Sequence, residues 1–380
     1  MRGGDPVLFD LPAEAQAKPE MLMLVRESRG MTQAEVAERM AKLAAASGST
    51  VSQGYVSRAE KGRLLVTGER LGLYAQALEC VPSLLCLDAQ VADVGIGLIH
   101  HRKRAALSAP ALRGIHAQLA LTRLHVQNLL EAAEIPADGT RFVRIPVNET
   151  YPPFEAAEDV REAWGMPVGP VVDLTGWIER AGGLVLRRDL GTDLLDAVSQ
   201  WPAGRGPLLL VNDRAPGDRL RFSIAHELAH LTMHQAPGET ALQERQADEF
   251  AAAFLMPEEQ IHQDLAGGTD LGHLTELKEK WGVSMAALLR RAHTLGTLTE
   301  WQYRNSMIEM SALGYRTSEP GVVEPEQPTA VHEALERAVR GGSLTPAALA
   351  ERMHLHLEDL RRGYAANDFD QTTASTEVRP

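Results

Sequence analysis

The sequence predicts a multidomain α+β protein with an all-α N-terminal domain, an α+β core and a small helical C-terminal domain. Helical periodicity, interrupted by short glycine turns, extends from Met21 to about Leu87. After Asp138–Gly139, short β-rich runs alternate with helical stretches, a pattern that is typical of an α+β domain. A Pro- and Glu-rich segment, Ser318–Thr329, then separates this region from a last helical stretch.

Length and composition agree with several folded domains. The chain has 380 residues, 44% hydrophobic and 23% charged, and at roughly 150 residues per domain this length predicts two or three domains. The 38 Lys and Arg against 51 Asp and Glu leave a net charge of −13, which excludes a surface that binds nucleic acid everywhere but allows a local DNA-binding domain. The two cysteines and the absence of a signal peptide or long apolar run predict a cytoplasmic protein without membrane contact.

The expected domain boundaries follow these changes in sequence pattern. In order, they are a flexible arm at 1–19, a helical domain at 20–87, a helical linker at 88–140, the α+β domain at 141–296, a helix and linker at 297–330, a small helical domain at 331–365 and a tail at 366–380. In the α+β domain, FVRIPV, GLVLRR and PLLLVN are the β-rich runs. The basic run HHRKR, His100–Arg104, is interpreted as solvated linker, with phosphate contact as the alternative.

One predicted helix carries the pattern of a metal site, RFSIAHELAHLTMH at Arg221–His234. Residues four apart lie on one face of a helix, so His226 and His230 project toward the same point. Glu227 lies beside that point and can reach a water there as a general base. This HExxH spacing is typical of a hydrolytic metal site. The alternative is a pair of satisfied core histidines on a half-buried helix.

A second helix, in ERQADEFAAAFLMP, supplies further candidate residues. Glu244 is placed to give a third, oxygen ligand, and Asp248 one turn later is placed to orient a ligating histidine. Two His, one Glu and an open position favour a catalytic rather than a structural centre, with Zn²⁺ expected and Mn²⁺ as the alternative. His234 is either a substrate or oxyanion contact or, as we favour, a histidine that interacts with the helix C-terminal dipole.

These two helical segments together resemble the ImmA/IrrE family of metallopeptidases, and the similarity extends over about Arg141–Gly296. The resemblance implies a zincin-like α+β fold in which His226, His230 and Glu244 bind the metal and Glu227 is the catalytic base. It also implies that the partner is a repressor-like protein that is cut at a specific site, and that this cleavage relieves repression during DNA damage or mobile-element induction.

The N-terminal domain carries a pattern typical of DNA binding. Thr32 and Glu35 form a T-x-x-E capping box that opens one helix, and a second helix covers Gln53–Gly62. Gln and Arg side chains suit base edges, and Ser and Lys suit phosphates. The predicted DNA-contacting residues are Gln33, Gln53, Gly54, Ser57, Arg58 and Lys61.

Residues 20–87, with LVRESRGMTQAEVAERM and SRAEKG, resemble the XRE family of helix-turn-helix repressors. They depart from it in the stretch AKLAAASGSTV between the two helices, which is about ten residues longer than the usual tight turn. The alternative is a small helical bundle that contacts only protein.

A short internal similarity links the two ends of the chain. Thr32–Met40 reads TQAEVAERM and Thr345–Met353 reads TPAALAERM. Two interpretations are open: two amphipathic helices that share common helix-forming residues, or a reduced second helix-turn-helix, with Glu358–Tyr364 as its partner helix, that serves dimerisation or regulation.

The favoured hypothesis is a DNA-associated zinc endopeptidase that cleaves a regulatory protein, a transcriptional repressor, in a stress or DNA-damage response. DNA is then a partner, either as duplex bound by the helix-turn-helix or as a single-stranded activator, and a homodimer is compatible with this hypothesis. One alternative is an XRE-type transcriptional regulator whose metallopeptidase-like domain senses a ligand without proteolysis. The other is a protease effector of a toxin or phage-defence system.

Overall fold

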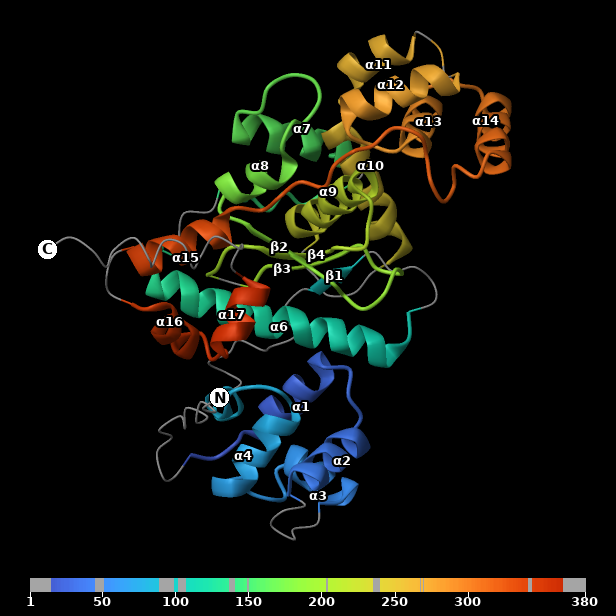
Figure 1. The fold of residues 1–380 in the computed structure, drawn as a ribbon. Helices are drawn as coiled ribbons and strands as arrows, with labels where there is room; N and C mark the ends of the chain where they lie inside the picture. Colours follow the sequence, from blue (N-terminus) through green and yellow to red (C-terminus); the bar gives the residue numbers. More distant parts are fainter. Residues whose placement is uncertain are drawn as a thin grey trace, which may run out of the picture. The chain divides into compact units, whose positions relative to one another are not determined.

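The computed structural model describes residues 15–44, 51–88, 99–101, 107–136, 141–148, 150–202, 204–234, 240–266, 268, 270–340 and 344–364 (Figure 1). These residues form two compact units. The first unit consists of the described parts of 1–96, 107–136 and 332–380, and the second of the described parts of 97–106 and 137–331. Among the described residues, no helix is both long and apolar enough to cross a membrane.

The first unit begins with the helical domain expected at 20–87. Its helices are α1 (Pro19–Ser28), α2 (Gln33–Leu43), α3 (Gln53–Glu60), α4 (Gly68–Ala77) and α5 (Pro82–Leu85). The predicted capping box opens α2, where the Thr32 hydroxyl accepts from the Glu35 amide and the Glu35 carboxylate accepts from the Thr32 amide. The extra residues between α2 and α3 fall largely at 45–50, outside the described residues, and α2 still packs against α3.

Further helices complete the first unit: α6 (Ala109–Ala132), α15 (Ala330–Arg340), α16 (Pro346–Arg352) and α17 (Leu357–Gly363). The expected linker helix, α6, packs against α1, and its Leu121 and Leu124 join the apolar core of the helix-turn-helix. The α16 helix packs against both α6 and α17. The described residues of 107–136 and 332–364 therefore belong to the same compact unit as the helix-turn-helix.

The sheet of the second unit has the strand order β1-β3-β4-β2. Its strands are β1 (Ile99–His101), β2 (Leu184–Arg188), β3 (Ala197–Gln200) and β4 (Leu208–Asn212). The β2–β4 pair is parallel, and β4–β3 and β3–β1 are antiparallel. Two of the expected β-rich runs form β2 and β4. The third, FVRIPV at 142–147, forms no strand, because Phe142 packs on Trp164 and Trp201, and Ile145 donates its amide to the Thr232 carbonyl instead.

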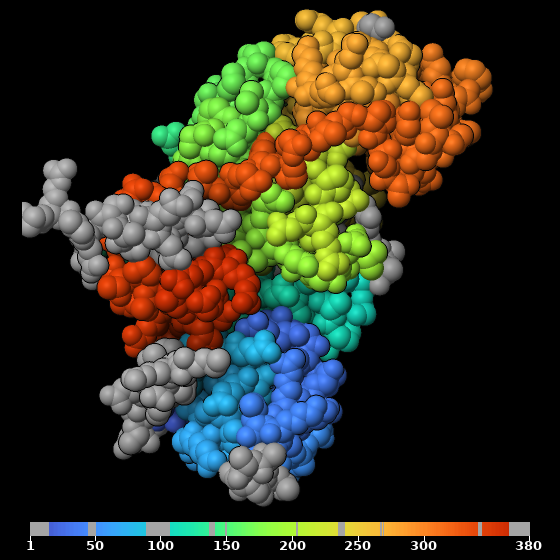
Figure 2. Space-filling view, viewed as in Figure 1, coloured from blue at the N-terminus to red at the C-terminus, as the bar shows by residue number. Residues whose placement is uncertain are grey.

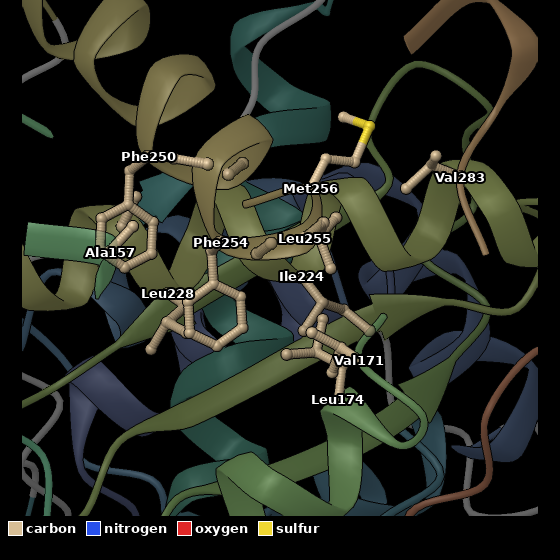
Figure 3. Close-up of a cluster of buried hydrophobic side chains, with 14 of the residues drawn as sticks. Ala157, Val171, Leu174, Ile224, Leu228, Phe250, Phe254, Leu255, Met256 and Val283 are labelled. Atoms are coloured by element: carbon tan, nitrogen blue, oxygen red, sulfur yellow. The ribbon is translucent and has the colours of Figure 1, made fainter. Parts of the chain in front are cut away.

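The helices of the second unit pack around α9 (Gly217–Met233) and α10 (Ala241–Leu255), which lie against each other, with α9 also against β3 and β4. Figure 3 shows their shared core, in which Phe250 and Phe254 of α10 stack near Leu228 of α9. The other helices are α7 (Pro153–Trp164), α8 (Leu174–Arg180), α11 (Glu258–Leu265), α12 (Leu271–Trp281), α13 (Met285–Thr294) and α14 (Glu300–Ala312). As Pro257 predicts, α10 ends before it.

The Pro- and Glu-rich segment at 318–329, which its composition predicts to be a linker, is bound to the second unit. We call it the strap, because it crosses the second unit and binds it at two acidic residues (Figure 2). Glu319 accepts from Lys278 Nζ at 3.0 Å and from the first amides of α13. Glu326 pairs with Arg221 of α9 and accepts from the first amides of α8. Both carboxylates satisfy helix N-termini, where negative charge is favourable.

Candidate metal centre and helix-turn-helix surface

The structure brings the three expected metal ligands to one point. His226 and His230 lie one turn apart on α9, are fully buried, and place their Nε2 atoms 3.1 Å from each other. Glu244 reaches this point from α10, with Oε1 at 3.2 Å from His230 Nε2 and Oε2 at 3.5 Å from His226 Nε2. The packing of α10 on α9 therefore brings Glu244, which is distant in sequence, beside the histidine pair as a third candidate ligand.

Asp248 holds the ring of His226 from behind, as the sequence predicted. Its Oδ1 lies 3.0 Å from His226 Nδ1. Because an ionised carboxylate only accepts hydrogen bonds, Nδ1 carries the ring proton and Nε2 keeps its lone pair. That lone pair faces Glu244 and His230. One turn of α10 separates Asp248 from Glu244, so the same helix supplies both the third ligand and the orienting carboxylate.

His234 plays the corresponding part for His230. Its Nδ1 lies 2.8 Å from His230 Nδ1, and its Nε2 lies 3.2 Å from Gln246 Oε1. Burial, followed by the neighbouring His230, lowers the pKa of His234 to about 4, so the ring is neutral at pH 7. An amide oxygen only accepts, which puts the His234 proton on Nε2 and makes Nδ1 the acceptor for His230.

This arrangement bears on the two interpretations of His234. The residue is the C-cap of α9, at the helix terminus as we favoured, and both ring nitrogens are occupied by protein groups. It therefore lies behind His230 rather than in position for a substrate or an oxyanion. His230, like His226, is left with its Nε2 lone pair directed at the common point.

The donor set fits a divalent metal ion. Two imidazole lone pairs that face each other at 3.1 Å repel unless a cation lies between them. Burial raises the pKa of the Glu244 carboxyl, but its contacts with His226 and His230 outweigh burial and keep the pKa below its usual range. The carboxylate is therefore ionised at neutral pH. Two nitrogens and one oxygen in this geometry are the ligands that Zn²⁺ and Mn²⁺ accept.

The expected base, Glu227, directly follows His226 on α9, is fully buried and is held by a residue that the sequence did not single out. Ser199, on β3, donates its hydroxyl to Glu227 Oε2 at 2.6 Å. The short run AVSQ carries no strong strand signal, and nothing in sequence spacing connects Ser199 with α9. Its role follows only from the packing of β3 against α9.

A cavity of about 650 Å³ is lined by residues of α9, α10, α13 and α14 and by Leu194 and Asp196, which precede β3. Its lining includes Asp248, Arg245 and Arg290, but none of the three candidate ligands and not Glu227. The cavity therefore reaches the back of the centre, where His226 is oriented. The face of the centre that carries Glu227 lies toward β3 instead.

Two of the candidate DNA-binding residues, Gln33 and Gln53, are connected to a bidentate ion pair. Arg26 of α1 binds both oxygens of Glu60, at 2.6 and 2.9 Å. Gln33 donates to the same carboxylate at 2.9 Å, and Gln53 donates to Gln33 Oε1 at 2.8 Å. This network crosses α1, α2 and α3, so the two glutamines are held in place despite the long connection between their helices. Arg26 and the internal role of Glu60 were not predicted.

The remaining candidates lie along α3 and at its C-cap. Gln53 and Arg58 are exposed, Gly54 and Ser57 are partly exposed, and Lys61 is the exposed C-cap residue. Because Glu60 faces Arg26, it does not neutralise Arg58 or Lys61; among the described residues neither cation forms an ion pair. Of the basic run at His100–Arg104, residues 102–104 lie outside the described residues, whereas the backbone of 100 and 101 belongs to β1 of the second unit.

Comparisons with known proteins agree with both parts of the chain. Residues 178–293 match the family model of the IrrE N-terminal-like domain, a range that contains β2 to β4 and the helices α9 and α10. Residues 22–85 match a helix-turn-helix family model. A comparison with curated proteins found no match. The chain therefore joins an XRE-type helix-turn-helix domain to a domain of the IrrE N-terminal-like metallopeptidase family, in that order.

Proposed function

We propose that this chain is a DNA-associated, zinc-dependent endopeptidase that cleaves a partner regulatory protein, a transcriptional repressor, in a stress or DNA-damage response. One observation carries the proposal: His226, His230 and Glu244 converge on one point, and the buried Glu227 directly follows His226 on the same helix. A purely structural metal site has no need of a general base at this position. The helix-turn-helix match supports the association with DNA.

The reaction follows from the positions of these side chains. His226, His230 and Glu244 would hold a divalent metal, which would supply Lewis acidity toward a peptide carbonyl and a water. Glu227 accepts the proton of the attacking water and passes it to the leaving amine. Ser199 holds the Glu227 carboxylate in one orientation.

The decisive experiment is Glu227→Gln in the full chain, with Glu309→Gln as the matched control. Glu309 is an exposed residue of α14, far in sequence from the centre. Purified helix-turn-helix repressors are incubated with the zinc-loaded proteins, with and without single- or double-stranded DNA. We expect Glu227→Gln to keep its metal and fold but to lose about 10²–10⁴ of the cleavage rate. Cleavage at the parental rate by this variant would refute the proposal.

A second function is favoured by the network around Glu60: sequence-specific DNA binding by a regulator that does not need proteolysis. Gln33 and Gln53 are held before DNA arrives, which lowers the cost of ordering them in a groove. A gel shift with Arg58→Ala tests this reading, with Arg304→Ala of α14 as the exposed control. Weaker binding of Arg58→Ala alone supports the reading, and equally tight binding of all proteins would contradict it.

A further inference from the structure

The edge of the sheet nearest the candidate base is covered by a segment of the chain itself. β1 pairs antiparallel with β3, with residue 99 opposite Gln200, residue 100 opposite Ser199 and residue 101 opposite Val198 (Figure 1). Without β1, the strand order would leave β3 as an edge strand. An uncovered edge presents a row of backbone N–H and C=O groups to any extended polypeptide.

The β3 edge is the sheet edge nearer to the candidate base, Glu227. Ser199 of β3 donates its hydroxyl to Glu227, and both β3 and β1 contact α9. The opposite edge, β2, lies beyond β4 and pairs with it in parallel. An extended polypeptide that enters the centre on the Glu227 side therefore finds β3 as its nearest strand. Addition of a strand to a free sheet edge is a general way of binding such a polypeptide.

β1 and an incoming strand would need the same place. Each would form its backbone hydrogen bonds with the same groups of β3, so the two cannot be bound together. β1 is only three residues long, whereas a longer polypeptide can form more bonds along the edge. The covering strand is therefore suited to be displaced rather than to be permanent.

The origin of β1 separates it from the rest of the sheet. It lies outside the range that matches the IrrE N-terminal-like domain, which begins at residue 178. Residues up to 96 and residues 107–136 on either side of β1 belong to the first unit, which carries the helix-turn-helix. The strand that covers the peptidase edge is thus supplied by the connection to the other unit.

We propose that Ile99–His101 is a built-in competitor, which occupies the place of an extended substrate on β3 and blocks the candidate peptidase site until it is displaced. The inference rests on the proposed function, because it concerns the regulation of the same site. A protein substrate must displace three residues of the chain before it can lie beside Glu227.

The test uses the full, zinc-loaded chain with Glu227→Gln, so that no peptide is consumed. Ile99→Pro and His100→Pro are added separately, each with alanine at the same position as its control. Successive residues of an antiparallel strand direct N–H alternately toward and away from the partner, so one of the two prolines removes a bond to β3. The probe is a fluorescent synthetic peptide, GIGLIHHRKRAA, with the sequence of residues 95–106.

We expect one proline variant to bind this peptide about tenfold or more tightly than the parent and both alanine variants. In the parent, β1 occupies the β3 edge in most molecules and so lowers the apparent affinity for the peptide, whereas the proline variant leaves the edge open. Hydrogen exchange should then show peptide-dependent protection at residues 197–200. Circular dichroism confirms that each variant is folded. Equal binding by all proteins, or protection at a different strand, would overturn the proposal.

Two further outcomes separate this inference from the proposed function. One outcome is tight peptide binding by the proline variant, with no cleavage of any repressor by the chain that retains Glu227. This outcome supports the proposed role of Ile99–His101 as a competitor and refutes the proposed peptidase function. Repressor cleavage at the same rate with and without the prolines, together with equal peptide binding, refutes only the competitor. Mass spectrometry of the zinc-loaded chain provides one more check, since a cut within 97–106 would make the segment a substrate and overturn its role as a block.

Discussion

At the residue scale, the two histidines of the centre are supported by different chemistry. His226 is held by the carboxylate of Asp248, and His230 by the neutral imidazole of His234. A hydrogen bond to an ionised acceptor is roughly twice as strong as one between neutral groups. Asp248 therefore restrains its histidine more firmly, whereas the His230 side depends on a chain of neutral groups that ends at Gln246.

This difference leads to a prediction for metal affinity. Asp248→Asn and His234→Ala should each weaken zinc binding by about 10–100-fold, because the ligating ring loses its fixed orientation. Competition with a chromophoric chelator at pH 7.5 measures the affinity. Glu227→Gln is the control, because Glu227 is not one of the three converging ligands and its variant should bind zinc as the parent does. Unchanged affinity in both support variants would show that neither residue orients a ligand.

The two cysteines allow a second prediction at this scale. Cys80 is buried, and burial raises its pKa to about 12. A raised pKa favours the thiol below that pH, so at pH 8 only about one molecule in 10⁴ carries the reactive thiolate. Iodoacetamide should therefore modify Cys80 in guanidinium but not in the native chain, as mass spectrometry would show.

Cys86 is the internal comparison, because it is only partly buried and its pKa is also raised by burial. It should react before Cys80 in the native chain. If Cys80 were alkylated as fast in the native chain as in guanidinium, its thiol would not be buried in the native chain.

At the scale of elements, the strap determines which residue can begin α9. Gly217 is the first residue of this helix, and a Cβ there would lie 2.1 Å from the Val323 carbonyl oxygen of the strap. Gly217→Ala must therefore move the strap or the helix that carries His226 and His230. We expect a loss of about 1–3 kcal/mol in the free energy of unfolding of the second unit.

The matched control for this prediction is Gly72→Ala in α4, where a Cβ meets nothing within 4 Å. Alanine there should raise the free energy of unfolding by about 0.5–1 kcal/mol, because glycine is disfavoured inside a helix. Urea unfolding followed by tryptophan fluorescence and circular dichroism measures both variants. Equal stability of Gly217→Ala and the parent would mean that the strap does not press on α9.

The elements differ in how far the sequence could predict them. Helical period and caps identified α2, α3, α6 and α9, because those signals are local. HExxH spacing located His226 and His230 for the same reason. β1 and β3 are too short for a pattern to appear, and their pairing joins residues about 100 positions apart. Ser199, which acts only through that pairing, could not be found from spacing.

The same limit explains two segments whose packing could not be predicted from composition. FVRIPV has the composition of a strand, but Phe142 packs against Trp164 and Trp201, and Val143 is exposed. The strap has the composition of a linker, yet two of its glutamates are bound to helix N-termini. In both segments, the partners lie too far away in the sequence to be read from composition.

At the scale of the whole molecule, the net charge of −13 says little about any one surface. Several acidic side chains are neutralised inside their own unit. Asp218 and Glu319 both bind Lys278, where burial lowers the pKa of the ammonium group but the two carboxylates outweigh it and raise the pKa. On the helix-turn-helix, Glu60 is bound by Arg26, so Arg58 and Lys61 keep their positive charge for a partner.

Local positive charge on an acidic chain predicts DNA binding that is weak and strongly dependent on salt. The logarithm of the binding constant should fall linearly with the logarithm of salt concentration, by about 0.9 for each phosphate contact. Lys61→Ala should reduce the magnitude of this slope by about 1, because a lysine at the C-cap of α3 suits a phosphate. Arg58→Ala should instead weaken binding to the preferred sequence more than to others, because arginine suits a base edge.

Fluorescence anisotropy with a labelled duplex, between 50 and 200 mM salt, measures the slopes. Arg304→Ala is the control, because it removes an equal charge from an exposed site on α14. If overall charge controlled binding, Arg304→Ala and Lys61→Ala would change the slope equally, since both make the chain more acidic by one charge. A slope that changes only with Lys61→Ala places the phosphate contact on α3.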